Sequence, residues 1–236
     1  MIELAYQGAE LESFAHAQRW KAYLRKALHP FLDGDILELG AGIGETTRAL
    51  RPGSRARRWT CVEPDPAMAE TVEAAARAGA FGDSVSTRCG TQADLPAGQH
   101  FDTALYVDVL EHIEDDRGEL NGVAERLRAG GRIVVLSPAY PFLYSEFDLA
   151  IGHFRRYTKA MLRRLAPPGM RLKAEFYLDG VGMLASLAAK ALLRQAQPSL
   201  RQVLFWDRVL VPLSRLLDPL TRRRFGRSVV TVWQKA

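Results

Sequence analysis

Three glycines and a glutamate near the start of the chain have the types and spacing of a nucleotide-binding loop. Gly40, Gly42 and Gly44 follow the apolar run at 36–39, and Glu63 lies 19 residues after the last glycine. Glycines between a strand and a helix let the backbone approach a ligand where the first N–H groups of the helix are unpaired. A carboxylate at the position of Glu63 can accept both ribose hydroxyls of an adenosine moiety. The alternative interpretation is an ordinary tight turn followed by a surface glutamate.

The charge around this loop favours one of two ligand classes. The dinucleotide fingerprint G-x-G-x-x-G would need a glycine at position 45, where this chain has Glu45. Glu38 stands just before the loop and Glu45 just behind it, so like charges would repel a pyrophosphate. They suit a ligand with a cationic amine or sulfonium. The residues therefore favour S-adenosylmethionine over NAD.

Two histidines are candidate general bases. His112 belongs to the pair Glu111-His112, and His153 belongs to the run Gly152-His-Phe-Arg-Arg-Tyr157. An imidazole takes up a proton near neutral pH, so either ring could remove one from an O–H or N–H acceptor. The run also contains a phenol, and we name His153, His112 and Tyr157 as catalytic candidates. The alternative is that both histidines only line the site.

Basic and aromatic side chains in the same region could hold an acceptor. Arg155 and Arg156 can each bind a carboxylate or phosphate in a bidentate manner. Tyr140 and Tyr144 lie in an aromatic-rich segment at 138–157. We name these four as substrate-binding candidates. The alternative for the two arginines is that they pair with acidic residues of the first half and anchor the segment as a lid.

The elements that must position these residues alternate between strands and helices. Apolar runs between turn signals predict strands, and longer amphipathic or alanine-rich stretches predict helices. Such alternation is typical of an α/β fold with a parallel sheet and helices on both faces. The predicted strands are Ile36–Leu39, Trp59–Val62, Ser84–Cys89, Phe101–Val107, Arg132–Ser137, Arg171–Tyr177 and Val229–Gln234, and the predicted helices are Glu10–His29, Glu45–Leu50, Pro66–Gly79, Glu119–Ala129, Thr158–Leu165, Val181–Gln195 and Leu200–Leu217.

Together these motifs resemble the class I S-adenosylmethionine-dependent methyltransferases, over about residues 30–140. The resemblance implies methyl transfer, S-adenosylmethionine as cofactor, and a Rossmann-like seven-stranded sheet whose last strand is antiparallel. The run at 152–157 is similar to a feature of one subgroup of bacterial methyltransferases. The motifs that carry the resemblance are Ile36-Leu-Glu-Leu-Gly-Ala-Gly-Ile-Gly44, Val62-Glu-Pro-Asp65, Phe101-Asp, Asp108-Val-Leu-Glu-His112 and Leu127-Arg-Ala-Gly-Gly-Arg-Ile-Val-Val135.

The resemblance also implies roles for individual residues. The glycine loop would cradle the methionine part of the cofactor, and Glu63 would hold the ribose, with Asp65 beside it. The segment Thr91–Leu95 would hold the adenine, with Asp94 as the polar contact. Asp108 would face the methionine end. The full set of expected cofactor-binding residues is Glu38, Gly40, Gly42, Gly44, Glu63, Asp65, Asp94 and Asp108.

The resemblance also bears on metal binding and on domain organisation. In some quinone-type relatives a pair such as Glu111-His112 contributes to a metal site, but we assign no metal ligand here. The last two predicted strands are about 50 residues apart, where the family usually has a short connection. We therefore expect one methyltransferase domain, 1–236, with a cofactor-binding core at 30–140, a substrate-side lid at 138–157 and a helical insertion at 179–227.

Charge is divided unevenly along the chain. The net charge is +5, but residues 1–150 contain 15 basic and 23 acidic residues, whereas residues 151–236 contain 17 and 4. The acidic part suits a cationic cofactor. The basic part combines amphipathic helices with Arg222-Arg223-Arg224 and Arg227, and such a combination can face an acidic acceptor or an anionic membrane surface. The alternative is that the apolar faces pack on the sheet or form a homodimer.

We therefore expect methyl transfer to the oxygen or nitrogen of a small or lipid-like acceptor, which can be acidic. Two cysteines without zinc or redox spacing and no recognised signal peptide favour the cytoplasm, with peripheral contact at the inner membrane surface. One alternative is an S-adenosylmethionine-binding regulator or partner subunit without turnover. A nucleic-acid methyltransferase is a third hypothesis, but its Pro-Pro-aromatic signature after the fourth strand is replaced here by Val107-Asp108-Val109-Leu110.

Overall fold

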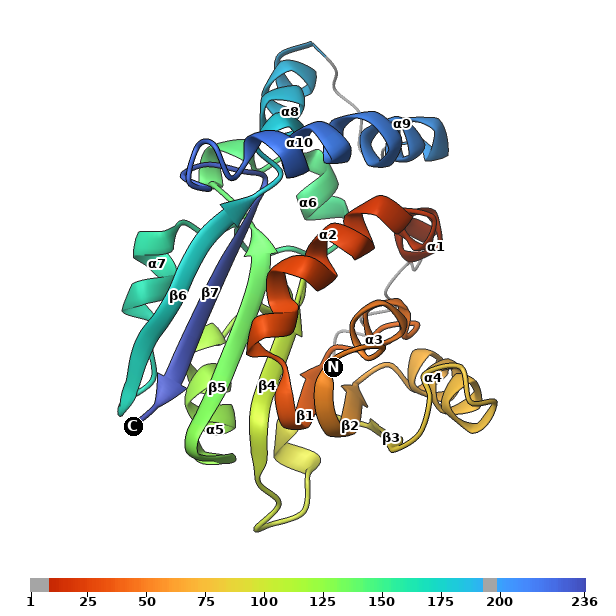
Figure 1. The fold of residues 1–236 in the computed structure, drawn as a ribbon, viewed down its shortest axis with the longest axis vertical. Coiled ribbons are helices and arrows are strands. Elements are labelled where there is room, and N and C mark those ends of the chain that lie inside the picture. The colour runs from red at the N-terminus through yellow and green to blue at the C-terminus, as the bar shows by residue number, and fades with distance from the viewer. Residues whose placement is uncertain (1–8, 193–198) are drawn as a thin grey trace.

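A seven-stranded sheet forms the centre of the molecule (Figure 1). The structure is a computed structural model that describes residues 9–192 and 199–236. The strand order is β3-β2-β1-β4-β5-β7-β6, and β7 runs antiparallel to both of its neighbours. This is the Rossmann-like arrangement predicted from the sequence, including the antiparallel last strand. The strands are β1 (Asp33–Leu39), β2 (Arg55–Glu63), β3 (Val85–Cys89), β4 (Phe101–Val107), β5 (Leu127–Pro138), β6 (Met170–Leu178) and β7 (Ser228–Lys235).

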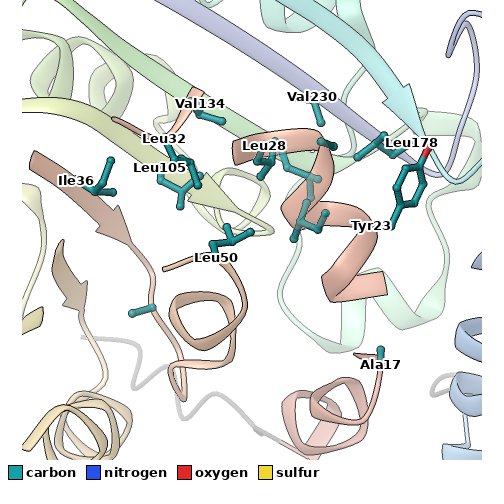
Figure 2. Packing of buried hydrophobic residues seen from close by; sticks show 14 of the residues in the cluster. Ala17, Tyr23, Leu28, Leu32, Ile36, Leu50, Leu105, Val134, Leu178 and Val230 are labelled. Atoms are coloured by element: carbon teal, nitrogen blue, oxygen red, sulfur yellow. The ribbon is translucent and has the colours of Figure 1, made fainter. Parts of the chain in front are cut away.

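The central strands are buried on both faces, which explains their continuous apolar runs. Successive side chains of a strand point to opposite faces, so neighbouring residues enter different cores. Ile36 of β1 and Leu105 of β4 belong to one core, whereas Leu37 and Tyr106 belong to the other. Figure 2 shows the first core, in which Tyr23 and other side chains of the N-terminal helices pack against the sheet.

Helices cover both faces of the sheet. The first core receives side chains from α2, α3, α4 and the helices of the insertion, and the second receives them from α5 and α7. Single helical turns occur at His29–Phe31, Gln92–Asp94, Leu110–His112 and Pro141–Leu143. The helices are α1 (Ala9–Ala15), α2 (Gln18–Leu28), α3 (Glu45–Leu50), α4 (Pro66–Arg77), α5 (Asp116–Glu125), α6 (Glu146–Ala150), α7 (Lys159–Arg164), α8 (Gly180–Leu192), α9 (Leu200–Phe205) and α10 (Val211–Leu217), with the π-helical turn η5 (Trp206–Leu210) between the last two.

Two of the predicted helices were wrong in extent. The single helix expected at Glu10–His29 is divided into α1 and α2 at Ala17, whose backbone is not helical. The free N–H groups at the start of α2 donate to the carboxylate of Asp207, a residue of the insertion. The helix expected at Glu119–Ala129 ends at Glu125, because the chain from Leu127 already pairs with β4.

The helical insertion lies between β6 and β7, as predicted. Its helices α8, α9 and α10 cross the end of the molecule where β5 and β6 finish (Figure 1). The helix predicted at Val181–Gln195 corresponds to α8, and its predicted last residues, 193–195, lie outside the described part of the chain. Among the described helices, none has the length and apolar character needed to cross a bilayer.

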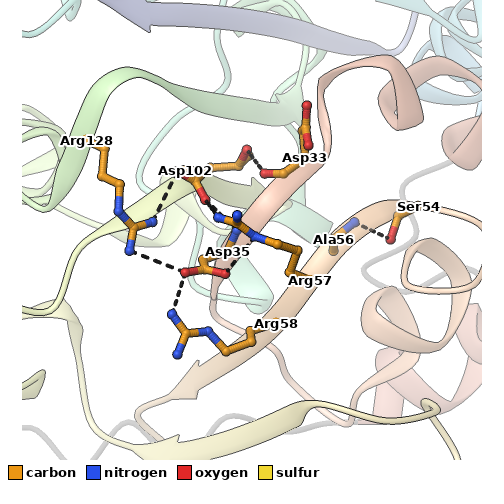
Figure 3. A network of polar contacts seen from close by, with 9 residues as sticks. Asp33, Asp35, Ser54, Ala56, Arg57, Arg58, Asp102 and Arg128 are labelled. Carbon is orange, nitrogen blue, oxygen red and sulfur yellow. Dashed lines mark hydrogen bonds and ion pairs between the residues drawn. The ribbon is translucent and has the colours of Figure 1, made fainter.

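The opposite end of the sheet is fastened by a polar network (Figure 3). Asp35 of β1 is buried and receives ion pairs from Arg57, Arg58 and Arg128. Asp102 at the start of β4 pairs with two of these arginines and accepts a hydrogen bond from the backbone N–H of Asp35. The network therefore joins β1, β2, β4 and β5 at their amino ends, away from the ends that carry the predicted site.

Candidate active site

The glycine loop joins β1 to α3, and its three glycines all have positive φ angles of +55° to +82°. A Cβ atom on Gly40 would lie 2.6 Å from Val109, and one on Gly44 would lie 2.7 Å from Phe81. These two positions therefore need glycine for close packing as well as for backbone conformation. A Cβ on Gly42 would meet only the side chain of Leu11, at 3.6 Å. Space is thus left beside Gly42, at the middle of the loop.

Glu63 ends β2 directly beside this loop. Its Oε2 atom accepts a hydrogen bond of 2.7 Å from the N–H of Gly42, and its Oε1 atom accepts one of 3.0 Å from Asp65. Burial raises the pKa of this carboxyl group. A carboxylate can accept about four hydrogen bonds, so each oxygen keeps one acceptor position. Glu63 can therefore receive the two hydroxyl groups of a ribose without giving up its bonds to the loop.

The other two glutamates of the loop have partners within the protein. The Oε2 atom of Glu38 accepts hydrogen bonds of 2.6 Å from Thr47 and from Trp59, which places this side chain beneath the loop. Its Oε1 atom is buried without a partner, and burial raises the pKa of the group to about 7. Glu45 is ion-paired with Lys21. Because Lys21 balances its charge, Glu45 contributes less to the attraction of a cationic ligand than the sequence alone suggested.

Two expected cofactor contacts also hold local structure. The Oδ1 atom of Asp65 caps α4 by accepting from the N–H groups of Ala67 and Met68. The carboxylate of Asp94 is exposed and accepts from the N–H and hydroxyl of Thr91. Both loops follow strands of the parallel part of the sheet. These hydrogen bonds leave acceptor positions free on each carboxylate, so both residues can still contact the cofactor, and these contacts stay predictions.

Asp108 follows β4 and has a positive φ angle of +53°. Its N–H donates to the carbonyl of Leu136, which fixes the turn against β5. The side chain reaches solvent, yet burial by the surrounding protein raises its pKa to about 6, although the nearby positive charge of Arg227 acts in the opposite direction. Val109, the next residue, packs against Gly40. The turn after β4 therefore joins the glycine loop to the cluster that contains the candidate bases.

The candidate base His153 is held by the lid. Its Nδ1 atom lies 2.8 Å from Oδ1 of Asp148, and its backbone carbonyl accepts a hydrogen bond from the hydroxyl of Tyr144. Arg156 donates two hydrogen bonds to the same aspartate, at 2.7 and 2.9 Å. Burial alone would raise the pKa of Asp148, but these two partners hold it well below its usual range. Asp148 is therefore an ionised carboxylate that fixes the imidazole.

On its other side, His153 faces the turn that contains Glu111 and His112. Its Nε2 atom lies 3.8 Å from Oε1 of Glu111, and its ring meets that of His112 edge to face, with centroids 4.6 Å apart. The N–H of Phe154 donates to the carbonyl of Glu111, which fastens the lid to this turn. Burial raises the pKa of Glu111 well above its usual value and lowers that of His112 to about 4.

The same cluster has the composition of a metal site. Ligand atoms of Glu111, His112 and His153 all lie within 4.8 Å of one another. Both carboxylate oxygens of Glu111 are buried without a hydrogen-bond partner. A carboxylate and two imidazoles are a donor set that divalent transition metals accept. No metal ligand was predicted from the sequence, whereas these three side chains could together bind a metal ion.

The structure assigns different roles to the other lid residues that we expected to act on the substrate. Tyr157 is almost fully buried, and its hydroxyl donates a hydrogen bond to Asp116, while its catalytic role stays a prediction. Arg155 also donates to Asp116, at 2.7 Å, and Arg156 is bound to Asp148. Both guanidinium groups therefore anchor the lid, which was the alternative interpretation, and their binding of substrate stays a prediction.

Two further residues had been placed differently from the sequence. Tyr140, within the lid segment, stacks on Phe142 and on Tyr177, with ring centroids 5.0 and 4.9 Å away. Arg227, counted with the exposed basic residues, lies with its guanidinium 5.0 Å from the ring of Trp206, close enough to Asp108 to lower that pKa. Glu111 was part of a motif but was assigned no role, and Asp148 lies in the lid segment without having been singled out. Their polar type within the lid and turn was the only signal that could have identified them.

Comparison with known proteins identifies a methyltransferase domain in this chain. Residues 37–133, which contain the loop, Glu63 and the turn after β4, match a family model described as a methyltransferase domain. Within this range the chain carries a methyltransferase domain. The loop geometry fits the cofactor of that family, because the space beside Gly42 and the remaining acceptors of Glu63 are both available.

Two curated relatives and one solved structure illustrate the similarity of this methyltransferase domain. A ubiquinone biosynthesis O-methyltransferase of Parvibaculum lavamentivorans is 27% identical over 164 residues, 63% of each chain. A demethylmenaquinone methyltransferase of Tropheryma whipplei is 30% identical over 156 residues, 65% of this chain and 60% of the relative. The chain thus spans about three fifths of the length of the curated relatives it matches.

The structural comparison supports the fold. The geranyl diphosphate C-methyltransferase of Streptomyces coelicolor, solved with Mg²⁺, geranyl diphosphate and S-adenosyl-L-homocysteine, has a TM-score of 0.66 and 14% identity. The match covers 99% of this chain and 88% of that one. At this identity the likeness concerns the arrangement of strands and helices, and the chemistry has to be argued from the site.

Proposed function

We propose that the chain transfers a methyl group from S-adenosylmethionine to an oxygen or nitrogen of a small or lipid-like acceptor. The observation that carries this proposal is the position of His153, held by Asp148 and facing Glu111 beside the turn after β4. The glycine loop and Glu63 follow β1 and β2, and Val109 connects them to that turn. Because parallel strands finish at the same edge, the loop and the base belong to one site.

The cofactor, when bound, supplies an electrophilic methyl group on a sulfonium, so the protein mainly has to align the acceptor and remove its proton. The ionised carboxylate of Asp148 holds the ring proton of His153 on Nδ1. This leaves the lone pair of Nε2 to take the proton of an O–H or N–H acceptor. Asp148 then stabilises the imidazolium that forms. His112, with its pKa lowered to about 4, stays neutral beside it at pH 7.

The chemical class of the acceptor can be inferred from the side chains of the lid. The lid exposes apolar side chains at Phe142, Leu149 and Phe154, which suit an apolar acceptor. The names of the two curated relatives refer to ubiquinone and demethylmenaquinone, which supports a lipid-like molecule. An acidic group on the acceptor is not required, because Arg155 and Arg156 are bound to aspartates of the protein. We therefore place a small or lipid-like O–H or N–H compound first.

The decisive experiment combines cofactor binding with transfer of a labelled methyl group. The protein is incubated with methyl-labelled S-adenosylmethionine and with hydroquinones, phenols, amines and a bacterial lipid extract, and the label is followed into the organic phase. Transfer that depends on His153 supports the proposal. Tight cofactor binding without transfer to any acceptor class would favour a regulator or partner subunit. Label appearing in added RNA or DNA would favour the nucleic-acid hypothesis.

A further inference from the structure

The largest group of exposed apolar side chains lies on the helical insertion. Of thirteen large apolar side chains that are exposed in the described residues, nine fall between positions 184 and 220. The most exposed of these nine are Leu220, at 77%, Leu216, at 68%, and Phe205, at 57%. Single exposed apolar residues are ordinary, but a concentration of this kind marks an interaction surface.

Five of these nine side chains form one stripe. The segment α9–η5–α10 is continuous, because Trp206 and Val211, where one part passes into the next, both have helical backbone angles. Along it the exposed positions are three or four residues apart, which puts them on one side of a helix. We call this side, together with the arginines that flank it, the outer face of residues 200–224. The apolar members of the stripe are Phe205, Val209, Leu213, Leu216 and Leu220.

The inner side of the same segment is fixed by buried polar contacts. The indole N–H of Trp206 and the hydroxyl of Ser214 both donate to the carboxylate of Asp179, at 2.7 and 2.6 Å. Asp207 accepts from the backbone of α2, and Asp218 accepts from the hydroxyl of Tyr23. Turning the helix to bury its stripe would break all of these bonds. The stripe is therefore held outward by the fold.

The charge on the outer face has one sign. All three acidic residues of the insertion, Asp179, Asp207 and Asp218, are buried in the contacts just described. The exposed charged residues of the described part of 200–224 are the arginines Arg201, Arg208, Arg215, Arg222 and Arg224. A cationic rim beside an apolar stripe matches an anionic lipid surface, whose headgroups take the arginines and whose acyl boundary takes the apolar side chains.

We propose that the outer face of residues 200–224 binds the surface of an anionic lipid bilayer. A second copy of the chain fits the charge less well, because a two-fold pairing of this face would set arginines against arginines with no exposed acidic partner. A nucleic acid would use the arginines but would leave Leu216 and Leu220 in water. In the cell the protein would then sit at the cytoplasmic side of the inner membrane.

Docking has a consequence for the acceptor, which rests on the proposed function. The insertion crosses the end of the molecule where β5 and β6 finish, and α8 packs against the lid turn Pro141–Leu143 (Figure 1). A bilayer bound to the insertion is therefore at the same end of the molecule as the lid. A lipid-like acceptor could enter from the membrane without passing through bulk water.

The test is co-sedimentation with vesicles of phosphatidylcholine alone or mixed with phosphatidylglycerol. We expect at least about tenfold stronger partitioning to the anionic vesicles at low salt, decreasing as salt is raised. In the double variant Leu216→Ser/Leu220→Ser the partitioning to anionic vesicles should be about tenfold weaker or more, since two apolar side chains no longer enter the acyl boundary. Arg208→Gln/Arg215→Gln should lose the preference for anionic vesicles. Equal binding to neutral and anionic vesicles would overturn the proposal.

Arg171→Gln/Leu172→Ser on β6 is the matched control, because both side chains are exposed but lie outside the insertion. It should bind vesicles like the unchanged protein, and an equal loss in the control would also overturn the proposal. Dimers in solution that Leu216→Ser/Leu220→Ser dissociates would assign the face to a second copy. Methyl transfer to a water-soluble acceptor should survive this double variant, so failure of docking and failure of the proposed function are read separately.

Discussion

The Nδ1 atom of His153 lies 2.8 Å from the Oδ1 atom of Asp148, five residues earlier in the chain. Arg156 binds the same carboxylate with two hydrogen bonds, so one aspartate holds both ends of the lid run. The imidazole is thereby turned with its Nε2 atom toward Glu111. This arrangement orients a base through an ionised carboxylate, and its parts can be tested separately.

Replacing the base should slow the reaction but leave cofactor binding intact. We expect His153→Gln to lower kcat about 100-fold, because the amide cannot accept the acceptor proton. The affinity for S-adenosylmethionine, measured by calorimetry, should change less than about twofold, since the affected atoms lie in the lid. The control is His100→Gln, at an exposed position. Unchanged kcat in His153→Gln would remove the histidine from the chemistry.

Asp148 should act as a positioning residue. In Asp148→Asn the carboxylate that stabilises the protonated imidazole is gone, while Arg156 keeps its charge. We therefore expect kcat to fall about tenfold or more and the acidic limb of the pH–rate profile to move to lower pH. Circular dichroism and cofactor affinity report whether the lid still folds. A lower rate with the pH profile in its original position would indicate a purely structural role.

Glu63 should contribute mainly to cofactor binding. We expect Glu63→Ala to weaken the binding of S-adenosylmethionine more than tenfold, about 1.4 kcal/mol, through the loss of the acceptors proposed for the ribose. Glu70→Ala is the control, since Glu70 is an exposed residue of the neighbouring helix α4. Calorimetry on both variants measures the difference. Equal affinities would withdraw the ribose assignment.

Substituting a glycine of the loop should reduce the unfolding free energy more than substituting a glycine that has open space around it. Gly40→Ala places a methyl group 2.6 Å from Val109, whereas Gly79→Ala meets nothing within 4 Å at a similar φ. Both variants bear the cost of a left-handed backbone, about 1 kcal/mol. We expect Gly40→Ala to lose about 1–3 kcal/mol more than Gly79→Ala in urea unfolding, because Val109 has to move. Equal losses of unfolding free energy in the two variants would show that Val109, in the turn after β4, moves aside at little cost.

The Asp35 network predicts a pH dependence of stability. The hydrogen bond from Arg58 lowers the pKa of Asp35, and the charges of Arg57 and Arg128 act in the same direction. Because the folded pKa is below the unfolded one, this stabilisation is present above about pH 4 and is lost as pH falls through the folded value.

Unfolding in urea tests this network. Between pH 5 and pH 3.5 we expect the unfolding free energy of the unchanged protein to fall by about 1 kcal/mol more than that of Asp35→Asn. Asp33→Asn, at a half-exposed position, should behave like the unchanged protein. The same pH dependence in all three proteins would show that the network contributes little.

Much of the predicted cofactor-binding region could be recognised from the sequence, because its motifs lie close together along the chain. The apolar run at 36–39, the three glycines and Glu63 follow one another within one strand-loop-helix-strand unit, and the positive φ angles of the loop favour glycine at its three positions. The right-handed connections of α/β folds agree with the parallel strands of this unit. The antiparallel last strand was available only through the family resemblance.

The substrate half depended on partners that are far apart in the sequence. Whether Arg155 binds an acceptor or Asp116 is decided by a contact across 39 residues, and the break before α2 is stabilised by Asp207 across nearly 190. No local pattern contains such information. Burial decides which partner each charged group takes, because a charge enclosed by the fold has to be paired within the protein interior.

The sequence by itself determined the amphipathic character of residues 200–217 and the charge of their arginines. Only the tertiary structure decided which side of that helix faces the core. Asp179, Asp207 and Asp218 form buried hydrogen bonds on the inner side, and breaking them would leave carboxylates unpaired in the interior. The apolar stripe therefore faces outward, because burying it would require breaking the polar contacts of the inner side.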